Sequence, residues 1–357
     1  MNLKIIYKKI LSIFFLFFYG KVVSKKKKIK NLQIVKLNKI NNENVSKYNY
    51  KLYRIKEGRV FTNYVENVSV ISDNQLIEGA SFQQIDGLLK NKQNETLFTG
   101  TPKFIKEIKG NMIILAQGAS GYDNYAHWLL DILPKLKLVL SKISIKKIGS
   151  VYFQKLNNFQ KDSLSYLGLS SNKFLDSNHL RHVKADQIIS TSHPYYFKKT
   201  FKYAQSNLPS WIIRFLRKDI SRKINFKKKG YKKVFIDRSD SRKNHCKLIN
   251  NDEIIKFLKK EKFKCLQLSK LSLKEQIAIF KNCRTIVAPH GAGLTNIAFC
   301  KKKTRVIEII PSNNKNYLFK RISKINKLEY KSIYLDKIYD NKNGDMHLNL
   351  IDLKKNL

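Results

Sequence analysis

Residues 284–311 read RTIVAPHGAGLTNIAFCKKKTRVIEIIP, and this stretch decides the fold of the second half of the chain. The β-branched run Thr285–Val287 predicts a strand that ends in a turn of proline, histidine and two glycines. The apolar segment Leu294–Phe299 predicts a helix, and Val306–Ile310 predicts a second strand. Strand, turn, helix and strand in this order are typical of a parallel α/β sheet.

The turn in this stretch is a candidate binding site for phosphate. Ligands bind at the carboxyl ends of strands in open α/β sheets, where helix N-termini attract phosphate. The turn offers the imidazole of His290 and the backbone amides of Gly291, Ala292, Gly293 and Leu294. The two glycines would let a ligand approach the backbone closely. An ordinary turn with a stray histidine is the alternative interpretation.

The composition permits a large core and favours a basic surface. At 357 residues and 43% hydrophobic, the chain predicts two domains. Its net charge of +45 comes mainly from lysines dispersed along the chain, which indicates a solvated face more than a recognition surface. Nucleic-acid binding is a hypothesis, but zinc-finger spacing, RNP-type aromatics and heptad-backed basic regions are missing from the sequence. Contact with anionic lipid headgroups is compatible with the charge.

The cysteines and histidines do not form a metal-binding pattern. No Cys-x-x-Cys pair occurs, so neither a zinc site nor a redox dithiol is indicated. Histidines 179, 182 and 193 lack the spacing of metal ligands, and nothing in the sequence requires a divalent metal. Four well-separated cysteines are more simply explained as thiols in a reducing compartment: Cys246, Cys265, Cys283 and Cys300.

The N-terminal region contains an apolar run, Leu11–Tyr19, between basic flanks. Spanning a bilayer needs ~20 apolar residues, so this run is short for a transmembrane helix. An interfacial anchor and a buried terminal helix are both compatible with it. The Lys- and Asn-rich residues 25–50 predict a poorly packed lead-in.

The alternation of strands and helices predicts an α/β protein. We expect a lead-in at 1–50, an amino-terminal domain at 51–226, a linker at 227–230 that opens a carboxy-terminal domain at 227–335, and a tail at 336–357. The predicted strands are 68–71, 104–108, 112–115, 148–153, 188–191, 233–237, 264–268, 285–287 and 306–310. The predicted helices are 124–140, with a kink or restart at Pro134, and 159–167, 208–224, 251–260 and 273–282.

The first of these helices carries the sequence Asn124-Tyr-Ala-His-Trp-Leu-Leu-Asp131. His127 and Asp131 are four residues apart, so on a helix they share a face and can hydrogen-bond. A carboxylate that orients an imidazole is a common way to hold a general base. A surface pair, or a pair that ties the helix to a loop, is the alternative.

A second cluster follows the predicted strand 233–237. Arg238 and Arg242 stand four apart in a loop at the end of that strand. Guanidinium groups bind phosphate oxygens through two parallel hydrogen bonds, and a strand end is where such a ligand lies. The alternative is that Asp237 and Asp240 pair with these arginines and order the loop.

Glu308 lies within an apolar strand that we expect to be buried. A buried carboxylate needs a partner, and ribose hydroxyls would satisfy it, as would an ion pair with Arg305 or another residue. Together with Asn296, Glu308 is our candidate for contact with the ribose or base of a nucleotide.

Taken in order, three motifs resemble glycosyltransferase family 61, which includes many bacterial capsular-polysaccharide proteins. They are the run Asn124–Leu136, the loop Ile236–Arg242, and the turn Pro289–Asn296 followed by the strand that ends at Pro311. The resemblance covers residues 112–311 and implies a GT-B architecture of two Rossmann-like domains. It also implies an inverting transfer, generally without an essential metal. The family commonly has a small polar residue where this chain has Asp237.

On this basis we expect an enzyme that transfers a sugar from a nucleotide-diphosphate donor, a UDP-sugar in the simplest case, to a glycan hydroxyl. No cofactor beyond this donor substrate is expected, and neither is a specific nucleic acid partner. Arg238, Arg242, His290 and the turn amides would stabilise the diphosphate, and His127 or Asp131 would be the base. We expect a place on the cytoplasmic face of a membrane, with an organelle lumen as the alternative. A polyanion-binding protein and an inactive sugar-nucleotide scaffold are the rival classes.

Overall fold

The computed structural model describes residues 3–24, 28–40, 42–63, 67–117, 123–195, 200–224, 230–241, 246–314, 316–336 and 345–357. The chain forms two compact α/β units, Met1–Ala204 and Gln205–Leu357. This division lies earlier in the sequence than the expected domain boundary after residue 226. Most of the expected linker at 227–230 falls outside the described residues.

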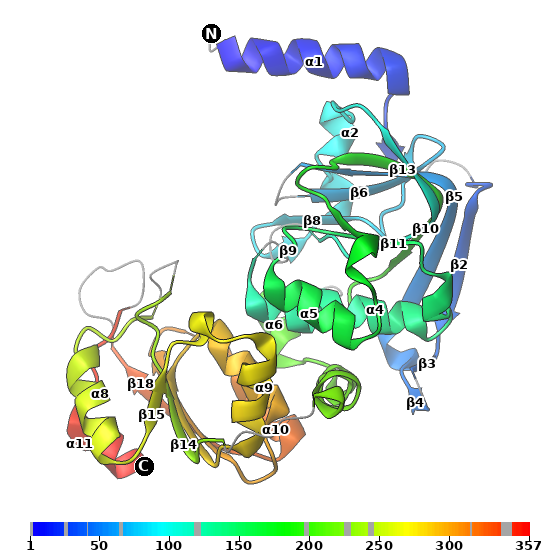
Figure 1. Ribbon diagram of the computed structural model, residues 1–357. Helices are drawn as coiled ribbons and strands as arrows, with labels where there is room; N and C mark the ends of the chain where they lie inside the picture. The colour runs from blue at the N-terminus through cyan, green and yellow to red at the C-terminus, as the bar shows by residue number, and fades with distance from the viewer. Residues whose placement is uncertain are drawn as a thin grey trace. The chain divides into compact units, whose positions relative to one another are not determined.

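The amino-terminal unit is built on a mixed sheet with the strand order β1-β7-β6-β5-β13-β10-β11-β12, to which β2, β8 and β9 are attached (Figure 1). The strands β10, β11, β12 and β13 run parallel to one another, whereas β5 pairs antiparallel with β13, β2 and β6. The described strands are β1 (Val23–Ser24), β2 (Leu32–Leu37), β5 (Tyr50–Thr62), β6 (Asn67–Ser72), β7 (Gln75–Leu76), β8 (Phe82–Ile85), β9 (Leu88–Leu89), β10 (Lys106–Ile114), β11 (Ser150–Phe153), β12 (Phe174–Asp176) and β13 (His182–Thr191), with a separate hairpin of β3 (Lys39–Ile40) and β4 (Glu43–Asn44).

This sheet is therefore only partly of the doubly wound type that the sequence predicts for the unit. The long strand β5 pairs with β13 over nine residue pairs and brings the chain back antiparallel. Strands predicted separately at 104–108 and 112–115 form one strand, β10, whose register with β13 shifts between Ile108 and Asn111. Such an irregularity interrupts the alternation of apolar and polar residues along a strand. The sequence pattern therefore predicts two short strands where the structure has one.

The described residues of the expected lead-in, 28–40 and 42–50, are packed, contrary to the prediction for 25–50. Strand β2 pairs with β5 along its whole length, from Leu32 opposite Ile55 to Leu37 opposite Tyr50. Leu37, Ile40 and Val45 are buried. The prediction failed because the described lysines of this segment face solvent, while these three buried apolar residues reach the core.

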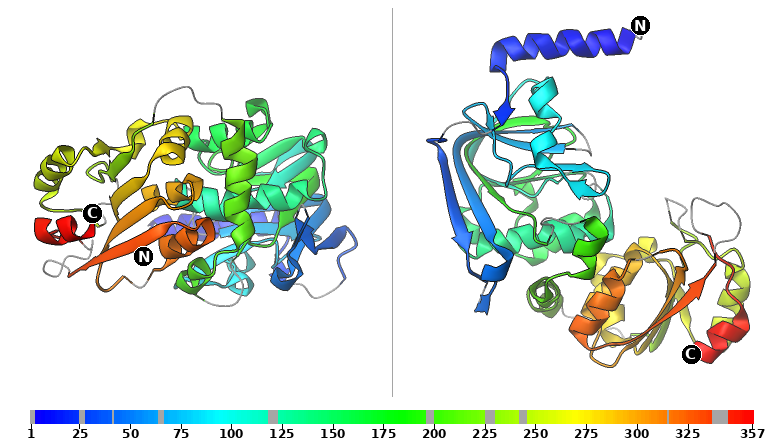
Figure 2. Two further views of the ribbon diagram at one scale, coloured as in Figure 1. Left: turned by 90° about the horizontal axis from the view of Figure 1, so that it is seen from below. Right: turned by 180° about the vertical axis from the view of Figure 1, so that it is seen from behind.

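The helices of this unit are α1 (Leu3–Tyr19), α2 (Thr96–Thr99), α3 (Tyr125–His127), α4 (Leu133–Leu140) and α5 (Asn158–Tyr166), followed by α6 (Phe201–Ser206) at the division between the units. Helix α1 lies at one end of the unit, above α2 in Figure 1 and again at the top of the right-hand view of Figure 2. Phe15 is buried against the ring of Phe104, and the hydroxyl of Ser12 donates to the carbonyl of Thr99. Among the described residues, no helix is long and apolar enough to cross a membrane.

The carboxy-terminal unit contains a parallel sheet in the order β15-β14-β16-β17-β18. Its strands are β14 (Lys233–Ile236), β15 (Lys264–Leu266), β16 (Thr285–Pro289), β17 (Arg305–Pro311) and β18 (Glu329–Leu335). This is the 2-1-3-4-5 order of doubly wound sheets, in which the chain changes direction between the first and third strands. The switch point therefore lies between β14 and β16, and the expected doubly wound sheet is confirmed here.

Helices cover both faces of this sheet. They are α7 (Ser210–Phe215), α8 (Asn251–Lys260), α9 (Leu273–Asn282), α10 (Leu318–Asn326) and α11 (Leu350–Asn356). Ile254 and Leu258 of α8 share one core with Phe235, Val287 and the other inward residues of the strands. Figure 1 shows α8 and α11 on one side of the sheet and α9 and α10 on the other.

Of the segment expected as a tail, residues 336–357, the described residues 345–357 are part of this fold. Leu353 of α11 is fully buried in the same core as Met346 and Leu348, and the guanidinium of Arg305 donates to the carbonyl of Leu357. The sequence pattern missed α11 because only one residue in each turn of this short, lysine-rich helix faces the core.

Candidate active site

The helix at residues 124–140 is made of three segments. Asn124 caps its first turn, α3, by accepting from the amides of Ala126 (2.9 Å) and His127 (3.2 Å). A π-helical turn, η3 (Trp128–Ile132), then leads into α4, which carries Pro134 in its first turn. Proline has no N–H to donate to the preceding turn. The wider π-helical turn accommodates this missing hydrogen bond without ending the helix. The expected restart at Pro134 is confirmed, and the wider turn positions Asp131.

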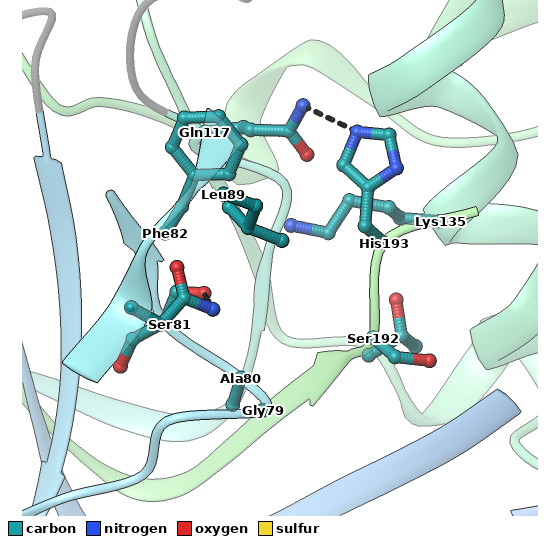
Figure 3. Close-up of a pocket in the computed structure, with 11 residues that line it drawn as sticks. Gly79, Ala80, Ser81, Phe82, Leu89, Gln117, Lys135, Ser192 and His193 are labelled. Atoms are coloured by element: carbon teal, nitrogen blue, oxygen red, sulfur yellow. Dashed lines mark hydrogen bonds between the residues drawn. The ribbon is translucent and has the colours of Figure 1, made fainter. Parts of the chain in front are cut away.

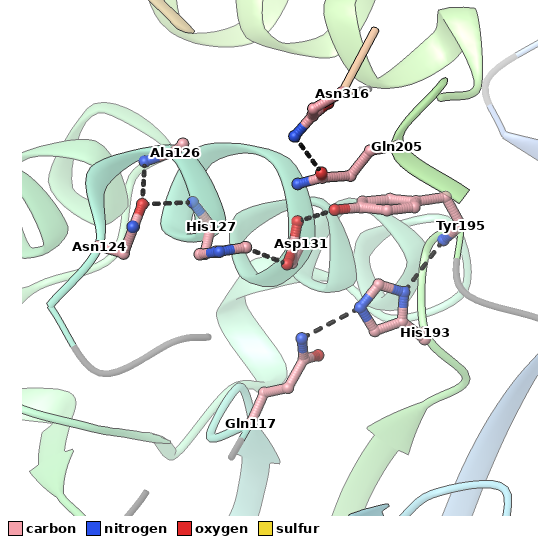
Figure 4. Close-up of polar contacts among 9 residues, drawn as sticks. All are labelled: Gln117, Asn124, Ala126, His127, Asp131, His193, Tyr195, Gln205 and Asn316. Carbon is pink, nitrogen blue, oxygen red and sulfur yellow. Dashed lines mark hydrogen bonds and ion pairs between the residues drawn. The ribbon is translucent and has the colours of Figure 1, made fainter. Parts of the chain in front are cut away.

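His127 and Asp131 form the hydrogen bond that their spacing predicts. The Nδ1 of His127 lies 2.8 Å from Oδ2 of Asp131, whose side chain is fully buried while the imidazole is 19% exposed (Figure 4). The hydroxyl of Tyr195 donates to the other carboxylate oxygen. An acceptor at Nδ1 places the ring proton there, so Nε2 carries a lone pair. Phe201 packs beside the ring, with centroids 5.2 Å apart.

This helix is anchored by Trp128, which is fully buried and donates from Nε1 to Ser163 of α5 (2.8 Å). The indole also packs against Phe153 at the end of β11. These contacts fix the rotation of the helix about its axis. Asp131 therefore faces inward and His127, four residues earlier, lies at the margin of the core.

The second and third sequence clusters meet at the switch point of the carboxy-terminal sheet. Arg238 follows β14, and the turn from His290 to Gly293 follows the neighbouring strand β16. A Cβ atom at Gly291 would lie only 1.5 Å from Nη1 of Arg238, so the guanidinium lies directly against the turn. Burial lowers the pKa of Arg238, although the group stays cationic at neutral pH. Two segments about fifty residues apart in sequence are thus in contact at the switch point.

Protein packing by itself leaves no room for a side chain at either glycine of this turn. Gly291 makes room for the guanidinium of Arg238. A Cβ at Gly293 would meet Leu268 Cδ1 at 2.9 Å and Ile236 Cγ2 at 3.4 Å. The sequence correctly indicates that no side chain fits here, but the atoms that exclude it belong to the chain itself.

The residues after Gly291 form a 3-10 helix, η9 (Ala292–Phe299). The amide of Leu294 donates to the carbonyl of Gly291 (3.0 Å), so it closes the first turn and is not available to a phosphate, contrary to our expectation. The amides of Ala292 and Gly293 precede that first bond. They are the N–H groups of the helix start that an anion can accept from.

His290 is held by Glu308. Its Nδ1 lies 2.5 Å from Oε1 of Glu308, because β16 and β17 are paired with Ala288 opposite Glu308. The hydroxyl of Tyr330 donates to the second carboxylate oxygen, and burial together with the charge of Glu308 raises the pKa of Tyr330 well above its usual range. Glu308 is 1% exposed and both its oxygens have protein partners. The geometry therefore gives it an orienting role in place of the ribose contact that we expected.

Asn296 is also placed differently from our expectation. Its side chain is fully buried and donates to Gln276 Oε1 (2.9 Å) and to the carbonyl of Gly293 (3.1 Å). It therefore braces the glycine turn from inside the unit, and a contact with ribose or base would require it to leave the core.

The carboxylate of Asp237 orders the loop that carries Arg238. It accepts from the amide (2.9 Å) and hydroxyl (2.9 Å) of Ser239, from Asn251 (3.1 Å) and from Gln267 (3.2 Å). Its loop-ordering partners are thus polar groups rather than the arginines considered in the sequence alternative. Arg242 lies outside the described residues, and its predicted phosphate contact stays a prediction.

No group of three or more histidine, cysteine, aspartate or glutamate side chains is arranged to hold a metal ion within the described parts of the chain. The residues that sequence reasoning missed are Tyr195 and Tyr330, each the second donor to a site carboxylate. No sequence pattern indicates such a role, because each tyrosine lies far along the chain from the carboxylate that it contacts.

These clusters fall within one known sequence family. The family model described as Glycosyltransferase 61 matches residues 125–307, slightly more than half of the chain. The chain belongs to glycosyltransferase family 61. The match begins two residues before His127 and ends one residue before Glu308, so it contains His127, Asp131, Arg238 and His290. The protein is therefore a glycosyltransferase that uses a sugar donor and a glycan acceptor.

Other comparisons add nothing to this assignment. No curated protein matches the transferase significantly. One solved structure, a mutant flavo di-iron protein from Thermotoga maritima, is similar at 9% identity over 91% of this chain and 97% of its own, with a TM-score of 0.24. A score this low carries no argument about fold or function.

Proposed function

We propose that this transferase moves a sugar from a nucleotide-diphosphate donor, specifically a UDP-sugar, to a glycan hydroxyl with inversion at the anomeric carbon. The observation that carries the donor assignment is the position of Arg238 against the turn at Gly291. A cation, two helix-start amides and an imidazole at the switch point of a doubly wound sheet are suited to a diphosphate.

In the proposed reaction the acceptor oxygen attacks the anomeric carbon as the bond from that carbon to the diphosphate oxygen breaks. The proton of the acceptor hydroxyl passes to Nε2 of His127, which Asp131 and Tyr195 hold in the required tautomer. The nucleoside diphosphate leaves with the bonding electron pair. Arg238, His290 and the amides of Ala292 and Gly293 stabilise its growing charge.

The roles of three residues follow from their contacts. Glu308, held by Tyr330, accepts from Nδ1–H of His290. In this proposal His290 acts as an imidazolium, whose Nε2–H donates to the diphosphate. Asn296 fixes the carbonyl of Gly293 and thereby the direction of the turn amides. Charge stabilisation by Arg238, His290 and Arg242 is our basis for proposing transfer without a metal ion.

For the architecture we propose GT-B, on the support of the family and of two α/β units. We further propose a role in surface-polysaccharide synthesis at the cytoplasmic face of a membrane. Helix α1 supports membrane contact, because Ile13, Phe17 and Phe18 are 67%, 88% and 60% exposed. Phe98 and Phe104, from segments that contact α1, are also exposed. Apolar surface of this kind beside basic residues is typical of interfacial helices.

A thermal-shift screen with UDP-, GDP-, CMP- and dTDP-sugars tests the donor assignment. A ligand that binds the folded state at 100 times its Kd stabilises it by about 2.7 kcal/mol. We expect stabilisation by UDP-sugars and its loss in Arg238→Ala, with Arg222→Ala as the control for removal of an arginine elsewhere in the unit. Equal stabilisation of Arg238→Ala by UDP would refute the phosphate role.

A further inference from the structure

A partly open cavity of about 210 Å³ lies in the amino-terminal unit, beside the helix that carries His127 and Asp131. Its wall is formed by the loop around Ala80, by the ends of β10 and β13, and by α4 (Figure 3). The volume corresponds to about seven water molecules and is smaller than drug-sized ligand sites. It therefore fits one small group, of the size of a sugar unit or less.

Lys135 points its ammonium into this cavity (Figure 3). The side chain is only 5% exposed, and no hydrogen bond or ion pair joins it to the described residues. Asp131, one helical turn earlier, forms no ion pair with it and instead accepts from His127 and Tyr195. A buried ammonium without a partner is costly, so a ligand that supplied an anion would gain from it.

A second polar group in the cavity wall is also without a partner. The hydroxyl of Thr191, at the end of β13, is buried and makes no hydrogen bond to the described part of the chain. By contrast Asn91, another lining residue, is engaged with Gln83, Glu78 and Ser81. The ammonium of Lys135 and the hydroxyl of Thr191 are therefore two hydrogen-bond donors in the cavity wall that are available to a ligand.

The remaining titratable group of the wall is neutral. Burial lowers the pKa of His193 to about 3; Asp131 opposes this, and the charges of Lys135 and His127 add to it. The amide of Tyr195 donates to Nδ1 of His193 (3.2 Å), and the side-chain Nε2 of Gln117 lies 3.0 Å from Nε2 of the ring (Figure 4). The cavity thus presents a single positive charge, which one carboxylate matches and a doubly charged phosphate does not.

We propose that this cavity is an acceptor subsite that binds a small carboxylate-bearing group, such as the acid group of a sugar acid, through Lys135 and Thr191. The assignment to the acceptor rests on the proposed function, because Lys135 lies on the same helix as the proposed base. The binding itself does not depend on that function. The subsite would make the transferase selective for acidic over neutral acceptor sugars.

Calorimetric titration with D-glucuronate and D-glucose tests the proposal, because the two sugars differ only at the carboxylate. Wild-type protein is expected to bind glucuronate at least about tenfold more tightly than glucose, as expected for a hydrogen bond to a charged group. Lys135→Met should abolish this preference and Lys142→Met, at an exposed lysine, should retain it. Equal affinity of the wild type for both sugars, or glucuronate preference retained in Lys135→Met, would overturn the subsite.

Two further measurements keep the outcome clear. Burial lowers the pKa of Lys135 to about 8, so glucuronate affinity should fall roughly tenfold or more between pH 7 and 9.5. If Lys135→Met does not fold, Thr191→Val provides the test of the subsite. We expect it to weaken glucuronate binding a few-fold and to leave glucose binding unchanged. UDP binding is measured on the same variants. If the protein does not bind UDP but still prefers glucuronate, the donor assignment is wrong and the carboxylate site is retained.

Discussion

His127 depends on Asp131 for its tautomer, and this dependence gives the sharpest test at the scale of a single residue. In Asp131→Asn the amide can present its NH₂ to Nδ1, which moves the ring proton to Nε2 and removes the base. We expect turnover to fall about 10²- to 10⁴-fold while UDP affinity is unchanged. Single-turnover transfer and UDP titration measure the two effects.

Tyr195→Phe is the matched control for that substitution. It removes one hydrogen bond to the carboxylate but leaves the charge that orients His127, so its effect on turnover should be smaller. Near wild-type turnover in Asp131→Asn would assign the proton to another group.

The unpartnered ammonium of Lys135 makes stability depend on pH. Burial lowers its pKa to about 8 in the folded state, against about 10.4 in an unfolded chain. Between these values the unfolded state binds more protons, so stability rises with pH across this window. Below about pH 8 the folded state bears the full free-energy cost of burying the charged ammonium. At pH 7 we expect Lys135→Met to be more stable than wild type by up to about 3 kcal/mol.

Urea denaturation at pH 7, 8.5 and 10 measures this difference. It should shrink as the pH rises toward 10, because the wild type then loses its buried charge. A difference that stays constant over this range would mean that Lys135 is not charged in the folded protein at pH 7.

Among the structural elements, the turn after β16 offers a matched pair of glycine substitutions. In Gly291→Ala the new Cβ displaces Arg238, so UDP affinity should fall about tenfold or more, beyond any loss of stability. In Gly293→Ala the Cβ meets Leu268 and Ile236 instead, so stability should fall by about 1–3 kcal/mol with UDP affinity retained. UDP titration and thermal unfolding of both variants separate the effects; equal losses of affinity would argue against a specific role for Arg238.

The accuracy of prediction also differs by element. Amphipathic helices were located to the residue, as α8 and α9 show, because their pattern is set by local sequence. Strand β5 and helix α11 were missed, since their burial depends on partners far away in the chain. For the same reason the hydrogen bond between His127 and Asp131 was predictable from spacing, whereas their link to Tyr195 was not.

For the molecule as a whole, the net charge of +45 and the exposed face of α1 predict binding to anionic membranes. Phe17→Glu/Phe18→Glu should weaken binding to phosphatidylglycerol vesicles about 100-fold or more, because two apolar side chains no longer enter the interface. Ile351→Glu, at a residue 60% exposed in the other unit, is the control. Vesicle co-sedimentation measures the change.

Salt and lipid composition complete that test. Binding should weaken in 0.5 M salt, whereas stabilisation by UDP should persist, because a partly buried diphosphate site is screened less than a surface. Equal binding to neutral phosphatidylcholine vesicles would contradict a role for the charge. A change of oligomeric state in the double variant without vesicles would identify a second copy of the chain as the partner.

His127, Asp131 and Lys135 follow one another at intervals of four along a single helix. One alanine inserted between Asp131 and Lys135 would preserve the first pair and turn Lys135 by about 100°, away from the cavity. One inserted between His127 and Asp131 would separate the imidazole from its carboxylate and leave Lys135 beside Asp131. The two insertions would thus yield one protein without acid selectivity and another without a base.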